Sequence, residues 1–373
     1  MTAQHGSTPA VSIKNRFAPL DGLRAIAALG VLWIHTWTLH SNPRCVIAGF
    51  DIASVLALAG NGVDLFFVIS GFCMYYFYAK NKSFSNADFW TFIKKRWIRL
   101  SPAFYTACMV YIISAKFRDP AYPVLPSIFT GLAYLNGILS NYTPVSILWS
   151  LTTEWQFYII IPFLLIYQDK PGFKKTFLII AFLMLIIAVL SVLFLKSGSD
   201  QLTSQIIFRY FEFMWGILAG NILLTRGDLQ LKYRPAYFIS FVLITYCGRA
   251  LLSKPVLNLD KDYYNLFKLA GFTIMGLGFS GIIYMALTSK KLLKAFLGNP
   301  VLSFIGKISF SFYLWHALIY PIVGEKTMAF FPHIHNLSAP LITFFISVIL
   351  LTPIAAASFY LLEQPFMNRT AKK

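Results

Sequence analysis

Charged residues are scarce in this chain, and acidic ones are scarcer still. Only 12% of the 373 residues are charged, and Asp and Glu number 14 against 32 Lys and Arg. A soluble globular domain has about a quarter of its residues charged. The chain is 57% hydrophobic with a mean hydropathy of +0.65, and apolar runs of about 20 residues recur along it. This composition excludes an ordinary soluble domain and is typical of a multipass helical membrane protein.

Other absences narrow the class further. The apolar runs do not alternate with polar residues, which argues against a transmembrane β-barrel. The four cysteines show neither a CxxC pair nor metal-ligand spacing, so we predict no disulfide framework and no metal site. The first 19 residues are polar or mixed and precede a run long enough to span, so we expect no cleavable signal peptide.

Several catalytic motifs are also missing. There is no HExxH helix, no Gly-x-Ser-x-Gly elbow and no P-loop, which leaves zinc protease, α/β-hydrolase and ATPase functions without support. The net charge of +18 suits contact with anionic lipid or a polyanionic ligand. Because the basic residues lie in short loops between spans, nucleic acid is not an expected partner.

The apolar runs predict an all-α integral membrane bundle of about ten transmembrane helices. The spans are residues 20–40, 60–79, 100–117, 146–167, 176–195, 204–225, 235–253, 265–287, 301–323 and 338–361. One further run, residues 126–139, is only about 14 residues long, which suits a re-entrant or interfacial segment.

Basic residues orient the bundle. With a cytoplasmic N-terminus and ten spans, most Lys and Arg of the connecting segments fall on the cytoplasmic side, as the positive-inside rule requires. We therefore predict that both termini are cytoplasmic, in a multi-pass plasma membrane protein. Residues 1–19 form an N-terminal tail, 20–367 one transmembrane domain and 368–373 a C-terminal tail.

Ionisable residues at membrane depth are costly and usually functional, and here they form two layers, because an α-helix rises 1.5 Å per residue. The outer-half layer contains His35, Asp64, Glu154, Arg209, Glu212 and His316. The inner layer contains Asp21, Arg24, Arg96, Arg99, Lys307 and Glu363.

His35 is the first candidate for catalysis. An imidazole beside a carboxylate holds one tautomer and accepts a proton, as a general base must, and Glu154 and Asp64 are predicted at matching depth. The alternative is a histidine that bonds a backbone carbonyl or helps helices associate. His316 has a weaker functional claim, since its sequence neighbours are apolar or aromatic.

Two further segments carry chemistry. Arg96 and Arg99 are three residues apart on one helix face, and paired guanidinium groups suit phosphate; binding of lipid headgroups is the alternative. Glu154 lies among aromatic residues in "WSLTTEWQFY", where a carboxylate must be paired, hydrogen-bonded or protonated. A structural ion pair with Arg209 is the alternative to a functional role.

The ordered set of motifs resembles the acyltransferase 3 family of multipass membrane O-acyltransferases, which modify bacterial surface polysaccharides, lipopolysaccharides and some glycosides. The motifs are "FAPLDGLRAIAALGVLWIH", "NGVDLFFVISGF", "FIKKRWIRLSPAFY", "LWSLTTEWQFY", "FRYFEFMWGILAG", "ISFSFYLWHALI" and "LEQPF". The resemblance covers residues 17 to 367. Some relatives add a periplasmic SGNH hydrolase-like domain, and we expect none within this chain.

The resemblance implies acyl transfer, usually acetyl transfer, from cytoplasmic acyl-coenzyme A to a sugar hydroxyl. Arg24 and His35 correspond to the functional pair of the first helix, Arg96 and Arg99 to the paired arginines, and Glu154 to a motif acid. We expect Arg24, Arg96 and Arg99 to bind acetyl-CoA, with no metal.

The acceptor side completes the expected mechanism. We expect His35 to deprotonate the acceptor hydroxyl or first to accept the acyl group. Glu154 or Asp64 would orient His35, while Arg209 and Glu212 bind a polysaccharide or glycolipid acceptor. The alternatives are a proton-coupled secondary transporter of a glycan or glycolipid and a non-catalytic scaffold for polysaccharide assembly.

Overall fold

A computed structural model describes residues 13–48, 50–56, 60–80, 84–167, 173–195, 200–252, 261–289, 292–334 and 336–371. The long helices are α1 Ile13–Leu39, α3 Gly62–Ala79, α4 Asp88–Arg118, α6 Trp149–Leu165, α7 Phe173–Leu195, α9 Ile206–Thr225, α10 Arg234–Leu251, α12 Lys261–Thr288, α15 Ser309–Phe330 and α16 Ser338–Ser358.

Shorter elements connect the long helices. They are β1 Val46–Ile47, β2 Phe50–Asp51, α2 Ile52–Leu56, α5 Val124–Leu132, the 3₁₀ turns η2 Ser140–Tyr142 and η3 Ser146–Leu148, α8 Asp200–Thr203, α13 Leu292–Leu297, α14 Pro300–Lys307, the π-helical turn η4 Phe359–Glu363 and α17 Gln364–Ala371. The antiparallel β1–β2 pair was not predicted. All the other regular secondary structure in the described residues is helical, which confirms the all-α class.

The number of spans is only partly supported. Among the described residues, seven helices are long and apolar enough to cross a membrane, and the bent pair α14–α15 would make eight. Helix α6 has only 17 residues, and α10 is also outside this set, so the count of ten and the placement of the termini stay predictions. Helix α5 has nine residues, too few to cross a bilayer, as predicted for residues 126–139.

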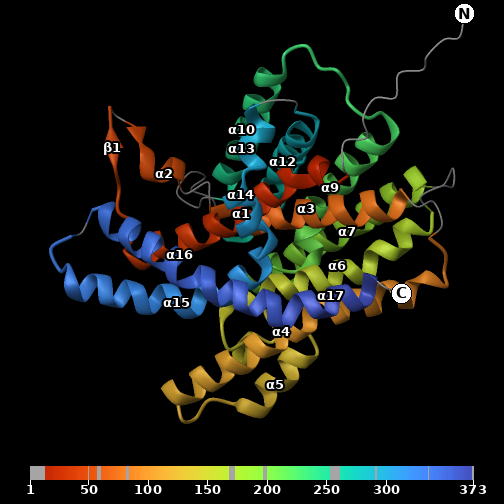
Figure 1. The fold of residues 1–373 in the computed structure, drawn as a ribbon. Coiled ribbons are helices and arrows are strands. Elements are labelled where there is room, and N and C mark those ends of the chain that lie inside the picture. The colour runs from red at the N-terminus through yellow and green to blue at the C-terminus, as the bar shows by residue number, and fades with distance from the viewer. Residues whose placement is uncertain are drawn as a thin grey trace, which may run out of the picture.

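The bundle surrounds two clusters of buried side chains. One centres on α3, α9 and α12, and the other on α1, α4 and α15. Helix α1 touches α3, α14, α15 and α16, so its side chains face both clusters. Figure 1 shows α17 close to α4 at the end of the chain, and these two helices are in contact. This arrangement places the C-terminal residues beside the Arg96–Arg99 segment.

Glycine allows α3 and α9 to cross at very close range. A Cβ atom on Gly71 would lie 2.1 Å from the Phe213 carbonyl oxygen, and one on Gly216 would lie 2.0 Å from the Val68 carbonyl oxygen. Small residues at such crossings let membrane helices approach closely. The contact fixes α3, which carries Ser70 and Cys73 of the cavity described below.

We expect Gly71→Ala to destabilise the bundle. The added methyl group forces α3 and α9 apart, and overpacking of this kind costs about 1–3 kcal/mol. The midpoint of thermal unfolding in detergent should fall. Gly131→Ala is the matched control, since its nearest neighbour would be at 3.5 Å, and an equal effect of both substitutions would contradict the close-approach argument.

Candidate active site

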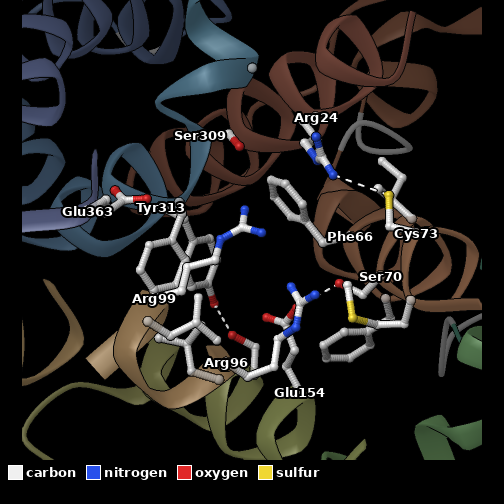
Figure 2. Close-up of a pocket in the computed structure, with 18 of the residues that line it drawn as sticks. Arg24, Phe66, Ser70, Cys73, Arg96, Arg99, Glu154, Ser309, Tyr313 and Glu363 are labelled. Atoms are coloured by element: carbon white, nitrogen blue, oxygen red, sulfur yellow. Dashed lines mark hydrogen bonds between the residues drawn. The ribbon is translucent and has the colours of Figure 1, made fainter. Parts of the chain in front are cut away.

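A cavity of about 250 Å³ lies between α1, α3, α4, α6, α15 and the C-terminal segment. Its polar and titratable lining residues are Asp21, Arg24, Ser70, Cys73, Arg96, Arg99, Ser150, Glu154, Tyr158, Lys307, Ser309, Tyr313 and Glu363. We call it the arginine cavity, because Figure 2 shows the guanidinium groups of Arg24, Arg96 and Arg99 directed toward the same central space. The structure thus gathers the whole predicted inner layer in one place.

Arg24 is held at the α1 side of the cavity. Its Nη1 donates to Asp21 Oδ1 at 2.9 Å, and its Nη2 lies 3.3 Å from Cys73 Sγ. The side chain remains 29% exposed, so the cation still faces open space. All four cysteines are free, and Cys73 lines the cavity.

Arg96 is held by aromatic rings. Its Nη2 donates to the Tyr78 hydroxyl at 3.1 Å, and its guanidinium carbon lies 5.5 Å from the ring centroids of both Tyr78 and Phe92. Its Nε is buried without a hydrogen-bond partner. Cation–π contact holds the charge in place without neutralising it, so Arg96 keeps its positive charge for a ligand.

Arg99 is the least engaged of the three arginines. Within the described ranges it has no hydrogen bond or ion pair. Its guanidinium interacts electrostatically with Arg96 and Arg24, which repel it, and with Glu363, which attracts it. Like charges crowded together repel each other, and an anion bound between them relieves the repulsion. The cluster is therefore a candidate anion site, and guanidinium groups suit phosphate in particular.

Glu154 lies in the same cavity as the arginines. Its Oε1 accepts hydrogen bonds from Ser70 Oγ at 2.6 Å and from the Tyr158 hydroxyl at 2.5 Å. The expected contact with His35 is absent from the described structure, because Glu154 faces the arginine cavity. The alternative ion pair with Arg209 is absent as well, since Arg209 pairs with other carboxylates.

Tyr313 also lines the arginine cavity. Its hydroxyl lies 2.7 Å from Ser150 Oγ and donates to the Ile147 carbonyl oxygen at 2.8 Å. Its ring contacts the ring of His316, with centroids 5.3 Å apart. Tyr313 therefore connects the cavity to the histidines behind it.

His35 lies beside a second histidine instead of a carboxylate. Its ring centroid is 5.2 Å from that of His316 and 5.4 Å from that of Tyr320, with which it stacks. His35 does not line the arginine cavity, and the 11 residues from Arg24 place it about 16 Å further along α1. Neither Glu154 nor Asp64 contacts His35 in the part of the chain that the structure describes: Glu154 bonds Ser70 and Tyr158, and Asp64 pairs with Arg209.

Asp64, Arg209 and Glu212 form a separate buried ionic cluster. Arg209 Nη1 lies 2.5 Å from Asp64 Oδ1 and 3.3 Å from Glu212 Oε1. Glu212 is fully buried and lines neither described cavity, so its role in acceptor binding stays a prediction. Depth along the helices matched these residues with His35, but their side chains meet one another where α3 packs against α9.

Breaking this cluster should destabilise the fold. Arg209→Met leaves two buried carboxylates unpaired, and losing one member of a buried ion pair costs about 3–5 kcal/mol. We expect a large drop in the thermal unfolding midpoint, and a smaller loss when Asp64→Asn is added. The control is Arg226→Met, an exposed arginine directly after the same helix, and equal midpoints for the two single variants would contradict the ionic role.

A second cavity of about 480 Å³ lies on the other side of the first turn of α6. Trp149 lines this second cavity, while the next residue, Ser150, lines the arginine cavity. The other lining residues are Gly137, Ser140, Thr143, Ser146, Thr203, Ser204, Arg209, Lys268 and Phe272. We call it the hydroxyl cavity, since five of its residues are Ser or Thr.

Sequence reasoning missed several of these residues. Tyr158, Tyr313 and Lys268 read as ordinary membrane-helix residues, although Tyr313 precedes His316 by three positions and so shares its helix face. Among the described residues, no group of three His, Cys, Asp or Glu could hold a metal ion.

With this geometry in view, comparison with known proteins defines the class. The acyltransferase domain of the acyltransferase 3 family matches residues 17–360, and the chain belongs to this family. It is similar to the O-acetyltransferase OatA of Staphylococcus aureus strains NCTC 8325 and COL, with 27% identity over 96% of this chain. It spans 58% of the length of those relatives. No solved structure matches the chain.

Proposed function

We propose that the protein is an integral-membrane O-acetyltransferase. It moves an acetyl group from acetyl-CoA to a sugar hydroxyl of a cell-surface polysaccharide or glycolipid. The observation that carries the proposal is the arginine cavity, in which Arg24, Arg96 and Arg99 converge in a member of the acyltransferase 3 family. The similar relatives named O-acetyltransferase support acetyl as the transferred group.

The donor enters from the arginine side. The phosphates of coenzyme A are met by Arg99 and Arg96, with Arg24 beside them, and bidentate guanidinium contacts suit their oxygens. Glu154 is fixed by Ser70 and Tyr158, and we assign it the task of keeping the neighbouring arginines in place. The thioester then extends along α1 toward Tyr313 and the histidines.

His35 acts as the general base. It takes the proton of the acceptor hydroxyl while the hydroxyl oxygen attacks the thioester carbonyl carbon. The carbon–sulfur bond breaks, and the leaving thiolate of coenzyme A recovers the proton from His35. The products are the acetyl ester and coenzyme A, so the protein ends in its starting state.

The hydroxyl cavity binds those sugar units of the acceptor that do not carry the reacting hydroxyl. Five hydroxyl side chains supply hydrogen-bonding groups, and Trp149 offers an aromatic face. Arg209 lines this cavity together with Phe272. Its guanidinium carbon lies 3.5 Å from the centroid of the Phe272 ring, so the two side chains form one surface of the site. Lys268 adds a cationic donor to the same cavity.

Replacing Lys268 should weaken acceptor binding alone. We expect Lys268→Gln to raise the KM for the glycan several-fold and leave the KM for acetyl-CoA unchanged, because the two cavities are separate. Steady-state kinetics in proteoliposomes measures both values. Lys326→Gln, an exposed lysine outside both cavities, is the control, and an unchanged acceptor KM in the Lys268 variant would reject this site.

Reconstitution tests the proposed function itself. The purified protein in proteoliposomes, given acetyl-CoA with an isotopically labelled acetyl group, should transfer the label to a surface glycan. Alkaline hydrolysis should release the label as acetate, because the product is an ester. Absence of transfer to every glycan supplied from the native cell envelope would contradict the proposal.

A further inference from the structure

His316 has a defined tautomer and an unused nitrogen. The residue is 1% exposed, and its Nδ1 lies 2.5 Å from the Tyr313 carbonyl oxygen. A carbonyl oxygen only accepts hydrogen bonds, so Nδ1 carries the proton and a neutral ring has its lone pair on Nε2. That Nε2 is buried and has no hydrogen-bond partner.

The aromatic ring whose centroid lies nearest to that of His316 among the described residues belongs to His35. The two centroids are 5.2 Å apart and the planes differ by 36°. Imidazoles joined nitrogen to nitrogen by an ordinary hydrogen bond have centroids about 5 Å apart. The separation of the two rings is therefore compatible with a hydrogen bond between a nitrogen of His35 and Nε2 of His316.

The surroundings of the pair hold the rings in place. Tyr320 stacks on both, with centroid distances of 5.4 Å to His35 and 6.1 Å to His316. No described carboxylate contacts either histidine. Asp64 is paired with Arg209, and Glu154 is bonded to Ser70 and Tyr158.

We propose that His316 is the positioning residue of His35. Its Nε2 accepts a hydrogen bond from one ring nitrogen of His35, which leaves the lone pair of the other nitrogen facing the acceptor hydroxyl. When His35 takes the hydroxyl proton, the same hydrogen bond stabilises the resulting imidazolium. His316 keeps its own proton on Nδ1 throughout. This role rests on the proposed function, since it acts only through His35 as general base.

Three substitutions separate positioning from packing. His316→Asn keeps an amide donor near the Tyr313 carbonyl but has no acceptor at the place of Nε2. His316→Gln carries an amide oxygen to that place, and His316→Phe keeps the ring without any polar atom. We expect kcat to fall at least tenfold in the Asn and Phe variants and to recover largely in the Gln variant. The KM for acetyl-CoA should stay unchanged in all three.

The control and the contradicting results are defined in the same assay. His40→Phe alters a half-buried histidine whose Nε2 lies 2.8 Å from Thr343 Oγ1, outside the pair, and it should leave kcat unchanged. Wild-type kcat in His316→Phe, or an equal loss in the Gln and Phe variants, would overturn the proposal. If His35→Ala stays active, the general-base function itself fails; an inactive His35→Ala with an active His316→Phe rejects His316 alone.

A measurement on the native protein tests the proposal even if the His316 variants fail to fold. Solid-state ¹⁵N NMR of histidine-labelled protein in lipid bilayers reports which nitrogen of His316 is protonated. We expect protonation at Nδ1 and a hydrogen-bonded lone pair at Nε2, whose signal shifts in His35→Ala. A proton on Nε2, or an Nε2 signal indifferent to His35→Ala, would overturn the proposal.

Discussion

The His35→Ala variant is expected to lose about 10²–10⁴-fold in kcat, the usual contribution of general-base assistance. Its KM for acetyl-CoA should not change, since His35 does not line the arginine cavity. The protein should still insert in the membrane, because the His35 ring is only partly buried. Transfer of labelled acetyl to glycan in proteoliposomes measures the loss.

His40→Ala is the matched control for this result. It lies five residues further along the chain and its partner is Thr343, so we expect near-normal turnover. A normally inserted His35→Ala with wild-type kcat would remove His35 from the mechanism, and the arginine cavity would then need another base.

The second large effect is expected from Arg99→Gln combined with Arg96→Gln. A hydrogen bond to a charged group is worth about 1.5–3 kcal/mol, so each lost arginine should raise the KM for acetyl-CoA about 10–100-fold. Arg99 should dominate, because Arg96 is already bonded to Tyr78. Initial rates over a range of acetyl-CoA concentrations give the two single effects and the double effect.

Vesicle composition distinguishes donor binding from lipid binding. In vesicles of neutral lipid the KM effect should persist, whereas a role in binding lipid headgroups predicts that it disappears. Lys94→Gln is the control, since Lys94 is exposed on the same helix and lies outside the cavity. An unchanged KM in the double variant would show that phosphate binds elsewhere.

The fold class could be predicted because hydrocarbon demands long apolar helices, a constraint that each segment carries in its own residues. The first and last residues of the helices were harder to predict. The sequence predicted a span from residue 100, whereas α4 begins at Asp88 and carries the basic segment within the helix. Polar residues at a helix end obscure the boundary, since they suit both a loop and a terminal turn.

The site was predicted in part. Arg24, Arg96 and Arg99 do lie together, because depth and helix face were both readable from their spacing. The partner of His35 could not be predicted from the sequence, because the depth of a residue in the bundle does not show which way its helix is rotated. Rotation places Glu154 toward the arginines and Asp64 toward Arg209, and it brings in His316, whose apolar sequence neighbours concealed the contact.

The measurement that tests the account most directly is mass spectrometry of surface glycans from a strain that lacks this protein. The account predicts that the glycans lose the mass of one acetyl group at the modified sugar. Expression of the wild-type protein should restore that mass, and equal expression of His35→Ala should not. Unchanged glycan masses in the deletion strain, or full restoration by His35→Ala, would contradict an O-acetyltransferase that uses His35 as its base.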